Sequence, residues 1–407
     1  MTRAVEARSE SAPSGRSERA AARAVPAFIA GARECFDRSG YVGTRIEDIA
    51  AAANYAVGSF YTYFSSKEEV LLTASRATDT AVPSEDRSTA ASAAPRLVQV
   101  LDRVEARCVR RLGLDTAMEQ AALRSRPVLD EWRLDRARAV GSVSDALRQA
   151  RLEVSLSDDE LATVSSALLS MSEQSLRLEL EVDAVAVLHI WEAAFSSALV
   201  EATPLTGRID PPTDSQALPL ATGSKDRLLA AANSLLTAES WDSVSVARIA
   251  EAAGVANGTF YRHFTSKAEV LAALIDSAPL LPPATRGVSL SFADEVFHLV
   301  VAHFDGVHRC AGLWSSVAEA VGAEALVHDA LGQARRRWLS SVGEVVRDWQ
   351  RSGEVAAGVD LATVVPLLAA MLEREAFLVA VVERAPDAIY GSAATVRDCW
   401  WRALTSS

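Results

Sequence analysis

The feature that most constrains this chain is an internal repeat with a fixed offset of 200 residues. Residues 44–71 and residues 244–271 are identical at 14 of 28 positions without a gap. The tetrapeptide Leu-Ala-Thr-Val at 161–164 recurs at 361–364, so the offset persists far beyond the first pair of segments. A sequence that repeats in this way contains the same structural unit twice. We therefore predict a duplicated fold, and not one protein that carries two borrowed motifs.

The best-preserved part of the repeat has the pattern of two helices joined by a tight turn. Ile249, Ala250 and Ala253 give the first helix a small apolar face. Gly254 can adopt the left-handed conformation that often ends a helix. Residues 257–263, which follow, carry small, polar and aromatic side chains suited to lying against a polyanion. This is the pattern of a helix-turn-helix motif, whose second helix enters the major groove of DNA.

The second copy resembles the TetR family of bacterial transcriptional regulators, because residues 254–267 read Gly-Val-Ala-Asn-Gly-Thr-Phe-Tyr-Arg-His-Phe-Thr-Ser-Lys. The first copy departs from this pattern at Asn54, Tyr55 and Tyr63, which replace Gly, Val and His. Asn tolerates the left-handed turn, so we expect both motifs to fold. The resemblance implies an all-α fold of two TetR-like units. Each unit is a helix-turn-helix head with a helical ligand and dimerisation body, and the two are expected to form an intramolecular pseudo-dimer.

The resemblance also implies which side chains meet DNA. The family's base-reading positions are occupied by Val57, Ser59 and Thr62 in the first copy and by Asn257, Thr259 and Arg262 in the second. Asn can pair with adenine and Arg with guanine, whereas Val can contact only a thymine methyl group, so the heads should prefer different half-sites. The family's phosphate-contacting positions are occupied by Tyr61, Tyr63, Lys67, Tyr261, His263 and Lys267.

Four further positions complete the expected DNA-binding set. Thr44 and Ser245 stand before the second helix of each head, and Thr44 is predicted to cap that helix together with Glu47. Gly58 and Gly258 lie inside the reading helices, where a glycine costs up to about 1 kcal/mol relative to alanine. They indicate either close approach of the backbone to DNA or tight packing on the preceding helix. The motif phenylalanines are predicted to be core residues: Phe60, Phe64, Phe260 and Phe264.

Composition bounds the fold and the compartment. A chain of 407 residues suits two to four domains, and a hydrophobic content of 49% with only 6% aromatics favours helical cores. No apolar run is long enough to span a membrane, and the N-terminus does not look like a secretory signal. The four cysteines form no Cys-x-x-Cys pair, so we expect a cytoplasmic protein without a disulfide or zinc framework.

The net charge of −12 is unusual for a protein that binds DNA. Residues 1–80 hold ten Lys/Arg and ten Asp/Glu, and residues 224–276 hold five and six. The two heads are therefore close to neutral, and the remaining −11 lies elsewhere in the chain. We expect modest non-specific affinity for DNA and a strong dependence on salt.

Changes of composition and periodicity predict the domain boundaries. A disordered polar tail is expected at 1–20, and a linker with four prolines and two glycines is expected at 203–223. Heads are expected at 21–80 and 224–277, and regulatory domains at 95–202 and 284–404. Head helices are expected at 21–38, 56–62 and 225–238. Body helices are expected at 96–111, 115–124, 128–151, 158–180 and 183–200, and at 292–309, 314–321, 324–351, 361–384 and 387–404.

A ligand pocket is implied only by the resemblance, which places it inside the body helices. Candidate lining residues are Met118, Trp132, Met171, Phe297, Phe304, Trp314, Trp338 and Met371, each of which is equally suited to an ordinary core. His298, His303 and His308 are spaced by five residues, which rotates each by roughly 140° from the last on a helix. Such histidines do not converge, so we expect no metal and no cofactor other than a small-molecule effector.

These observations favour a transcriptional regulator that binds a double-stranded DNA operator, which we expect to be a ligand-responsive repressor. Two other classes remain open: a protein-interaction module whose heads have lost DNA binding, and an enzyme built on a helical body, for which no catalytic residues stand out. The last two helices of each body, at 158–180 with 183–200 and at 361–384 with 387–404, are expected to form a four-helix bundle. If the bundle forms within one chain the protein is a pseudo-dimer, and if it forms between chains it is a homodimer with four heads.

Overall fold

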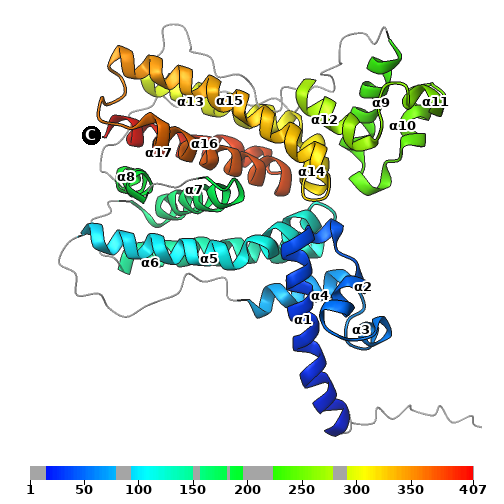
Figure 1. The fold of residues 1–407 in the computed structure, drawn as a ribbon. Coiled ribbons are helices and arrows are strands. Elements are labelled where there is room, and N and C mark those ends of the chain that lie inside the picture. Colours follow the sequence, from blue (N-terminus) through cyan, green and yellow to red (C-terminus); the bar gives the residue numbers. More distant parts are fainter. Residues whose placement is uncertain are drawn as a thin grey trace, which may run out of the picture.

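The computed structural model describes residues 15–78, 93–149, 156–180, 184–195, 223–277 and 291–406, and within these ranges every regular element is a helix (Figure 1). The first half contains α1 (Gly15–Gly43), α2 (Ile46–Ala52), α3 (Val57–Tyr63), α4 (Lys67–Ala77), α5 (Ala93–Ala122), α6 (Arg126–Gln149), α7 (Asp158–Arg177) and α8 (Ala184–Ala194). The second contains α9 (Ser224–Ala238), η1 (Trp241–Ser243), α10 (Val246–Ala252), α11 (Asn257–Phe260), α12 (Lys267–Ser277), α13 (Phe292–Arg309), α14 (Ala311–Ala320), α15 (Ala325–Ser352), α16 (Leu361–Phe377), a π-helical turn η2 (Leu378–Val382), η3 (Pro386–Ala388) and α17 (Ile389–Thr405). The predicted all-α fold of two related units is confirmed.

In Figure 1 the two heads, α1–α4 and α9–α12, lie on the same side of the molecule. Head 1 is next to α5, and head 2 is next to α14 and α15. Phe28, Ala32 and Phe36 recur at helical spacing on α1, and all three are buried as predicted. The helix begins at Gly15, so the last part of the tail predicted at 1–20 is helical, while residues 1–14 lie outside the described ranges. Gly40, with φ 62°, interrupts α1 near its end and turns the chain toward α2.

The body of the first half differs from the prediction at one helix. The two helices expected at 96–111 and 115–124 form one continuous helix, α5. Gly113, which lies between the two expected helices, lets α1 come close to α5, because a Cβ there would stand 2.5 Å from the Cα of Asp37. In the second half the matching segment does break, at Cys310, between α13 and α14. The linker expected at 203–223 lies outside the described residues except for Gly223.

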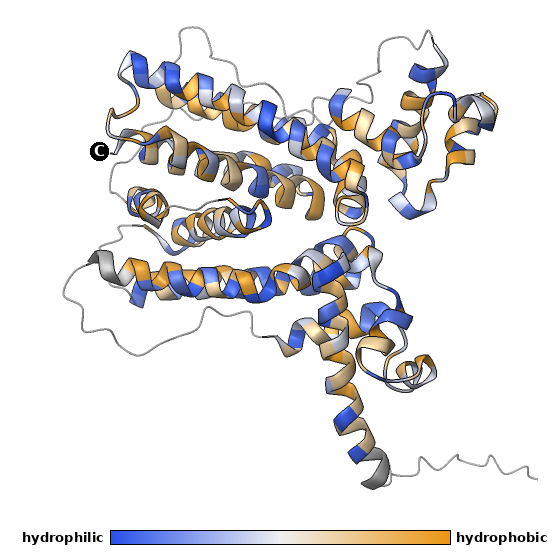
Figure 2. Cartoon of the chain, in the orientation of Figure 1, coloured by the Kyte–Doolittle hydropathy of each residue, from blue (hydrophilic) through white to orange (hydrophobic). Residues whose placement is uncertain are grey.

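The bodies of the two halves share one core. α7 packs on α16, and α17 packs on both α7 and α8, so the four helices expected to form a bundle meet within the chain (Figure 1). Leu168, Leu368, Met171 and Met371 are at most 1% exposed in this core. In Figure 2 the outer helices α5, α6 and α15 alternate polar and apolar turns, whereas α16 and α17 are mostly apolar. Amphipathic outer helices thus cover an apolar centre to which both repeats contribute.

A buried network of ion pairs also joins the halves. Arg374 of α16 donates to Glu119 of α5 and, at 3.2 Å, to Glu173 of α7. Glu173 also accepts two hydrogen bonds of 2.8 Å from Arg136 of α6. Burial alone would raise the pKa of Glu173, but the surrounding guanidinium groups hold it well below its usual range. Removing one member of such a network leaves an uncompensated buried charge, so it fixes how the halves fit together.

None of the helices in the described ranges combines the length and the apolarity that crossing a lipid bilayer requires.

Candidate nucleic-acid interface

Each head turns sharply between its second and third helices. Asn54 has φ 60° in head 1, and Gly254 has φ 64° in head 2. The N–H of Tyr55 then donates to the carbonyl of Ala50 at 2.9 Å, and the matching bond in head 2 is 3.0 Å long. These are the bonds of a helix that ends in a left-handed residue. The prediction that Asn54 sustains the turn in the divergent copy is confirmed.

Phenylalanines pack the reading helix of each head, α3 in head 1 and α11 in head 2, against the rest of that head. Phe60 and Phe64 are buried, and their rings lie 5.5 Å and 6.2 Å from the ring of Phe28 on α1. Phe260 and Phe264 are equally buried in head 2. Their predicted role as core residues is confirmed. Because one side of each reading helix is fixed in this way, the opposite side faces outward.

Glycines on the outward side have open space around them. A Cβ added at Gly58 or Gly258 would meet no atom of the described residues within 4 Å. Tight packing on the preceding helix, one of the two interpretations left open by the sequence, is therefore wrong. The remaining interpretation is that the missing side chain lets a partner approach the backbone of the reading helix.

The predicted base-reading side chains do reach the surface, with different chemistry in the two heads. Asn257 and Arg262 are exposed in head 2, and Arg262 can donate to Thr259, 3.4 Å away. In head 1 Thr62 is exposed, whereas Val57 and Ser59 are half-buried. Tyr61 and Tyr261, predicted to contact phosphates, are 57% and 61% exposed.

The two motif lysines, which were predicted to contact phosphates, are bonded inside their own heads. Lys67 Nζ donates to the carbonyls of Tyr41 and Thr44 at 2.7 Å and 2.8 Å, and lies 4.2 Å from the centre of the Tyr41 ring. Lys267 Nζ makes the same contacts with the carbonyls of Trp241 and Val244 and with the Trp241 ring. Burial lowers the pKa of both ammonium groups. Each lysine therefore fastens the loop that precedes the second head helix with two of its three N–H donors, and its phosphate contact stays a prediction.

Two further phosphate candidates are partly withdrawn from the surface. His263 is half-buried, and its Nε2 lies 2.6 Å from the hydroxyl of Ser224 at the start of α9. Tyr63 is half-buried with its ring 6.2 Å from that of Phe28. Both side chains therefore join the reading helix to the first helix of the head.

The side chain of Thr44 is placed so that it can neither cap the second helix of head 1 nor contact DNA, the two roles predicted for it. The side chain is 2% exposed, and its hydroxyl donates to the carbonyls of Cys35 and Gly40 at 3.1 Å and 2.6 Å. The second helix of head 1 begins one residue later than predicted, with the N–H of Arg45 bonded to Asp48. The predicted capping box of Thr44 and Glu47 is therefore wrong. A hydroxyl that is turned inward in this way cannot contact DNA.

Arg45 is a further exposed cation of head 1 that the motif did not indicate. Ser245 caps the second helix of head 2, where its hydroxyl accepts from the N–H of Arg248 at 3.3 Å. The fixed offset of 200 residues places Arg45 at the same position in head 1, where its side chain is exposed. Applying the offset to Ser245, and not pairing it with Thr44, would have found this cation.

The predicted ligand-pocket residues are dispersed. Met171, Phe297, Phe304, Trp338 and Met371 lie in the shared core, and Met118 and Trp132 border a space of about 10 Å³ beside the ion-pair network. Trp314 is the one candidate that lines the large cavity, whose volume is about 920 Å³. That cavity lies between the halves and not inside either body. In the described residues no three His, Cys, Asp or Glu side chains gather in a way that could hold a metal ion.

Comparison with known proteins gives two findings. The family model described as bacterial regulatory proteins, tetR family, matches residues 28–74 and again residues 228–274. The chain is also 30% identical over 145 residues to the HTH-type transcriptional regulator SrpR of Pseudomonas putida, an alignment that covers 34% of this chain and 67% of that protein. The likeness to that regulator extends well beyond the length of one motif match.

Proposed function

This chain belongs to the TetR family of bacterial regulatory proteins as a tandem duplication of the family's unit, and from that premise we propose that it is a ligand-responsive transcriptional repressor. It acts on an imperfect palindromic operator, reading the two half-sites with two heads carried on one chain. The observation that carries the proposal is the pair of exposed reading helices, which share one scaffold but present different side chains.

The proposal of a single-chain regulator rests on where the apolar surface goes. α7 and α8 are covered by α16 and α17 of the same chain, and the buried pair between Arg374 and Glu119 joins the halves. A second chain would have to displace these contacts in order to pair with its like. Two heads held by a common core would keep a fixed spacing, which a palindromic site of one helical turn between half-site centres requires.

The proposal of a reading role for both heads rests on matched surfaces. Exposed Asn257 and Arg262 can form paired hydrogen bonds with adenine and guanine in the major groove. Head 1 has Val57 and Thr62 at these positions, which suit a thymine methyl group and a single hydrogen bond. Such heads would recognise unlike half-sites, so the operator would be an imperfect palindrome.

The test combines mass, stoichiometry and sequence selection. Light scattering of the full chain at micromolar concentration should give a mass near 43.4 kDa, and selection from random DNA should enrich two unlike half-sites at fixed spacing. A stable mass of twice that value with four heads per particle would replace the single-chain arrangement with a homodimer. Enrichment of only one half-site would leave head 1 without a reading role and favour the interaction-module alternative.

A further inference from the structure

Each head is fastened to its own body helix by a hydrogen bond of the same kind. The N–H of Tyr41 in head 1 donates to the side-chain oxygen of Gln120 on α5 at 2.7 Å. The N–H of Trp241 in head 2 donates to the carboxylate of Glu319 on α14, also at 2.7 Å. Gln120 and Glu319 are 199 residues apart, so the second bond is the counterpart of the first. These two side chains mark the points at which the heads are attached.

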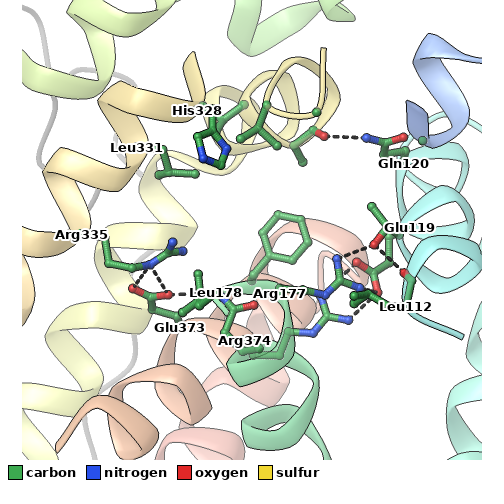
Figure 3. Close-up of a pocket in the computed structure, with 18 of the residues that line it drawn as sticks. Leu112, Glu119, Gln120, Arg177, Leu178, His328, Leu331, Arg335, Glu373 and Arg374 are labelled. Atoms are coloured by element: carbon green, nitrogen blue, oxygen red, sulfur yellow. Dashed lines mark hydrogen bonds and ion pairs between the residues drawn. The ribbon is translucent and has the colours of Figure 1, made fainter. Parts of the chain in front are cut away.

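The two attachment points are joined to each other across the halves. The amide nitrogen of Gln120 donates to the carbonyl of Ala318 on α14 at 2.9 Å, a bond that Figure 3 shows in the wall of the large cavity. One helical turn beyond Gln120, the Nε–H of Arg124 donates to Glu319 at 2.7 Å. α5 and α14 therefore meet at the place where both heads are attached.

Arg124 of the first half also reaches head 2 directly. Its Nη1 lies 3.5 Å from the carboxylate of Asp242, in the turn η1 of that head. The side chain of Arg124 is 30% exposed and that of Glu319 only 3%, so their pair is largely removed from solvent. We call the ion pairs of Arg124 with Glu319 and Asp242 the Arg124 bridge. A charged hydrogen bond to a buried carboxylate constrains geometry more strongly than an exposed ion pair does.

The sequence provides no counterpart of the Arg124 bridge on the other side. The offset of 199 residues that relates the attachment bonds pairs Arg124 with Ala323, and the repeat offset of 200 pairs it with Glu324. Neither is a cation, and the position that matches Asp242 is occupied by Val42. The bridge therefore depends on which half supplies which residue, and a symmetric pair of identical halves could not form it.

We propose that Arg124, acting through Glu319 and Asp242, is a positioning residue that fixes the separation of the two heads and thereby restricts the chain to one spacing of half-sites. In Figure 1 the reading helices α3 and α11 lie far from the crossing of α5 and α14, so a small tilt at the crossing displaces them by a larger distance. The restriction on half-sites rests on the proposed function, whereas the fixed separation of the heads does not.

The spacing of half-sites is sensitive to such a bridge. One added base pair moves a half-site by about 3.4 Å along the DNA and rotates it by roughly 35°. A chain with an intact bridge can follow this change only by breaking the bond between Arg124 and the buried carboxylate. A chain without the bridge can tilt its heads at a lower cost, and so loses discrimination between spacings while it keeps the reading face of each head.

Two substitutions remove the bridge in different ways. Arg124→Gln removes the cation, and Glu319→Gln removes its main partner. Glu319→Gln gives head 2 the residue type that fastens head 1, so the new amide oxygen can still accept the N–H of Trp241. It leaves no buried carboxylate unpaired, so the fold should be retained. Arg133→Gln is the matched control, because Arg133 also donates across the halves, to the carbonyl of Glu383 at 3.2 Å, but its partner there lies in the body and not in a head.

The first experiment measures the separation of the heads in the full chain without DNA. Spin labels are attached at Ala51→Cys and Glu251→Cys, matching exposed positions on α2 and α10, with the partly exposed Cys310 replaced by serine. Double electron–electron resonance should give one narrow distance distribution for the labelled parent chain and for its Arg133→Gln form. The distribution should be broader or shifted for each of the two bridge variants.

Combining Arg124→Gln with Glu319→Gln should broaden the distribution no further than either change alone, because both remove the same contact. A distribution that stays as narrow as that of the parent in both bridge variants would overturn the proposal. So would an equal broadening in Arg133→Gln, because it would indicate a general loosening between the halves. Circular dichroism establishes that the variants are folded.

The second experiment measures the preference for spacing. The selected half-sites are placed at their selected spacing and at spacings one base pair shorter and longer. The wild-type chain should lose about tenfold in affinity at each altered spacing, because fitting it breaks a charged hydrogen bond. The bridge variants should lose less than about threefold, since that bond is already absent. Arg133→Gln should behave like the wild-type chain, and affinity for an isolated half-site should be equal in all four proteins.

The outcomes separate the bridge from the proposed function. Equal dependence on spacing in the wild-type chain and both bridge variants would refute Arg124 as a determinant of spacing. A wild-type chain that binds no paired half-sites, but whose narrow distance distribution broadens in the bridge variants, would refute the palindromic operator and support Arg124 as the residue that positions the heads.

Discussion

Head 1 stands on a continuous helix of 30 residues, α5, whereas head 2 stands on a helix that breaks at Cys310 into α13 and α14. Asp37 and Thr237 occupy the same repeat position, and each lies against a glycine of its body helix. Those glycines, Gly113 and Gly312, are not equivalent: the offset between them is 199 residues and not 200.

A slip of one residue rotates a helix by roughly 100° and advances it by about 1.5 Å. The break at Cys310, with φ −104° and ψ 18°, separates the contact helix α14 from α13 and accommodates this change. The motif itself is unaffected, because its turn and its phenylalanine core are formed within each head. The two copies therefore show that duplicated heads can dock differently on their body helices and still fold in the same way.

The largest expected effect comes from removing the buried guanidinium group of Arg374, at a repeat position where the first half has no charge. Arg374 lies in the buried network, whereas the matching position in the first half is Gln174. Arg374→Met should lower the free energy of unfolding by about 3 kcal/mol, because the buried carboxylates of Glu119 and Glu173 each lose one guanidinium partner. Gln174→Met is the control and should cost about 1 kcal/mol. Urea denaturation measures both, and equal losses would contradict the special role of Arg374.

The second prediction tests the close contact between each head and the glycine of its body helix, which differs by one residue in position between the two halves. Gly113→Ala and Gly312→Ala should each cost about 1–3 kcal/mol, because the new methyl groups would stand 2.5 Å and 2.7 Å from the Cα atoms of the opposing helices. Gly141→Ala on α6, where a Cβ meets nothing within 4 Å, should be neutral or stabilise by up to about 1 kcal/mol. Thermal unfolding compares the three variants. A neutral Gly312→Ala would show that α9 does not approach α14 so closely.

A third prediction compares the reading faces. Arg262→Ala should cost about 1–2 kcal/mol on the half-site of head 2 and relax its sequence preference, because a paired contact with guanine is lost. Thr62→Ala, at the same position of head 1, should cost less than about 1 kcal/mol and affect the other half-site. Competition binding to operators with one randomised half-site separates the two effects. Equal losses on specific and random DNA would refute a base-reading role for Arg262.

The smallest expected effect is on salt dependence. Arg45→Ser gives head 1 the residue that head 2 has, and should lower the slope of log affinity against log salt by about one. Lys67→Met should leave this slope unchanged and reduce stability, because Lys67 bonds to loop carbonyls and not outward. DNA titrations at several salt concentrations decide between them. A lower slope for Lys67→Met alone would show that Lys67, and not Arg45, contacts a phosphate.

The sequence by itself determined the duplication, the helical class and the helix-turn-helix motifs. These features depend on short spacings: Asn54 and Gly254 lie between helices that end locally, and Phe60 and Phe64 are one helical turn apart. Interactions over three or four residues are visible in a linear pattern, because the helix geometry that brings the side chains together is known in advance.

Only the tertiary structure decided which polar side chains face outward. Lys67 and Lys267 look like surface cations in the sequence, but carbonyls 23 and 26 residues away bind them. Two helices were expected at 96–111 and 115–124, but they form one helix in which Gly113 lies against Asp37 of α1. In each case the deciding atom belongs to another element, and no local spacing specifies its position.

The cavity was also decided by tertiary structure. Its walls combine residues of both repeats, and contacts such as those of Gln120 with Ala318 and Arg374 with Glu119 join positions about 200 or more residues apart. Local patterns predicted the core of each half, but a space between two halves depends on how their surfaces fit. That fit is set by packing and by the pairing of buried charges, which are properties of the assembled chain.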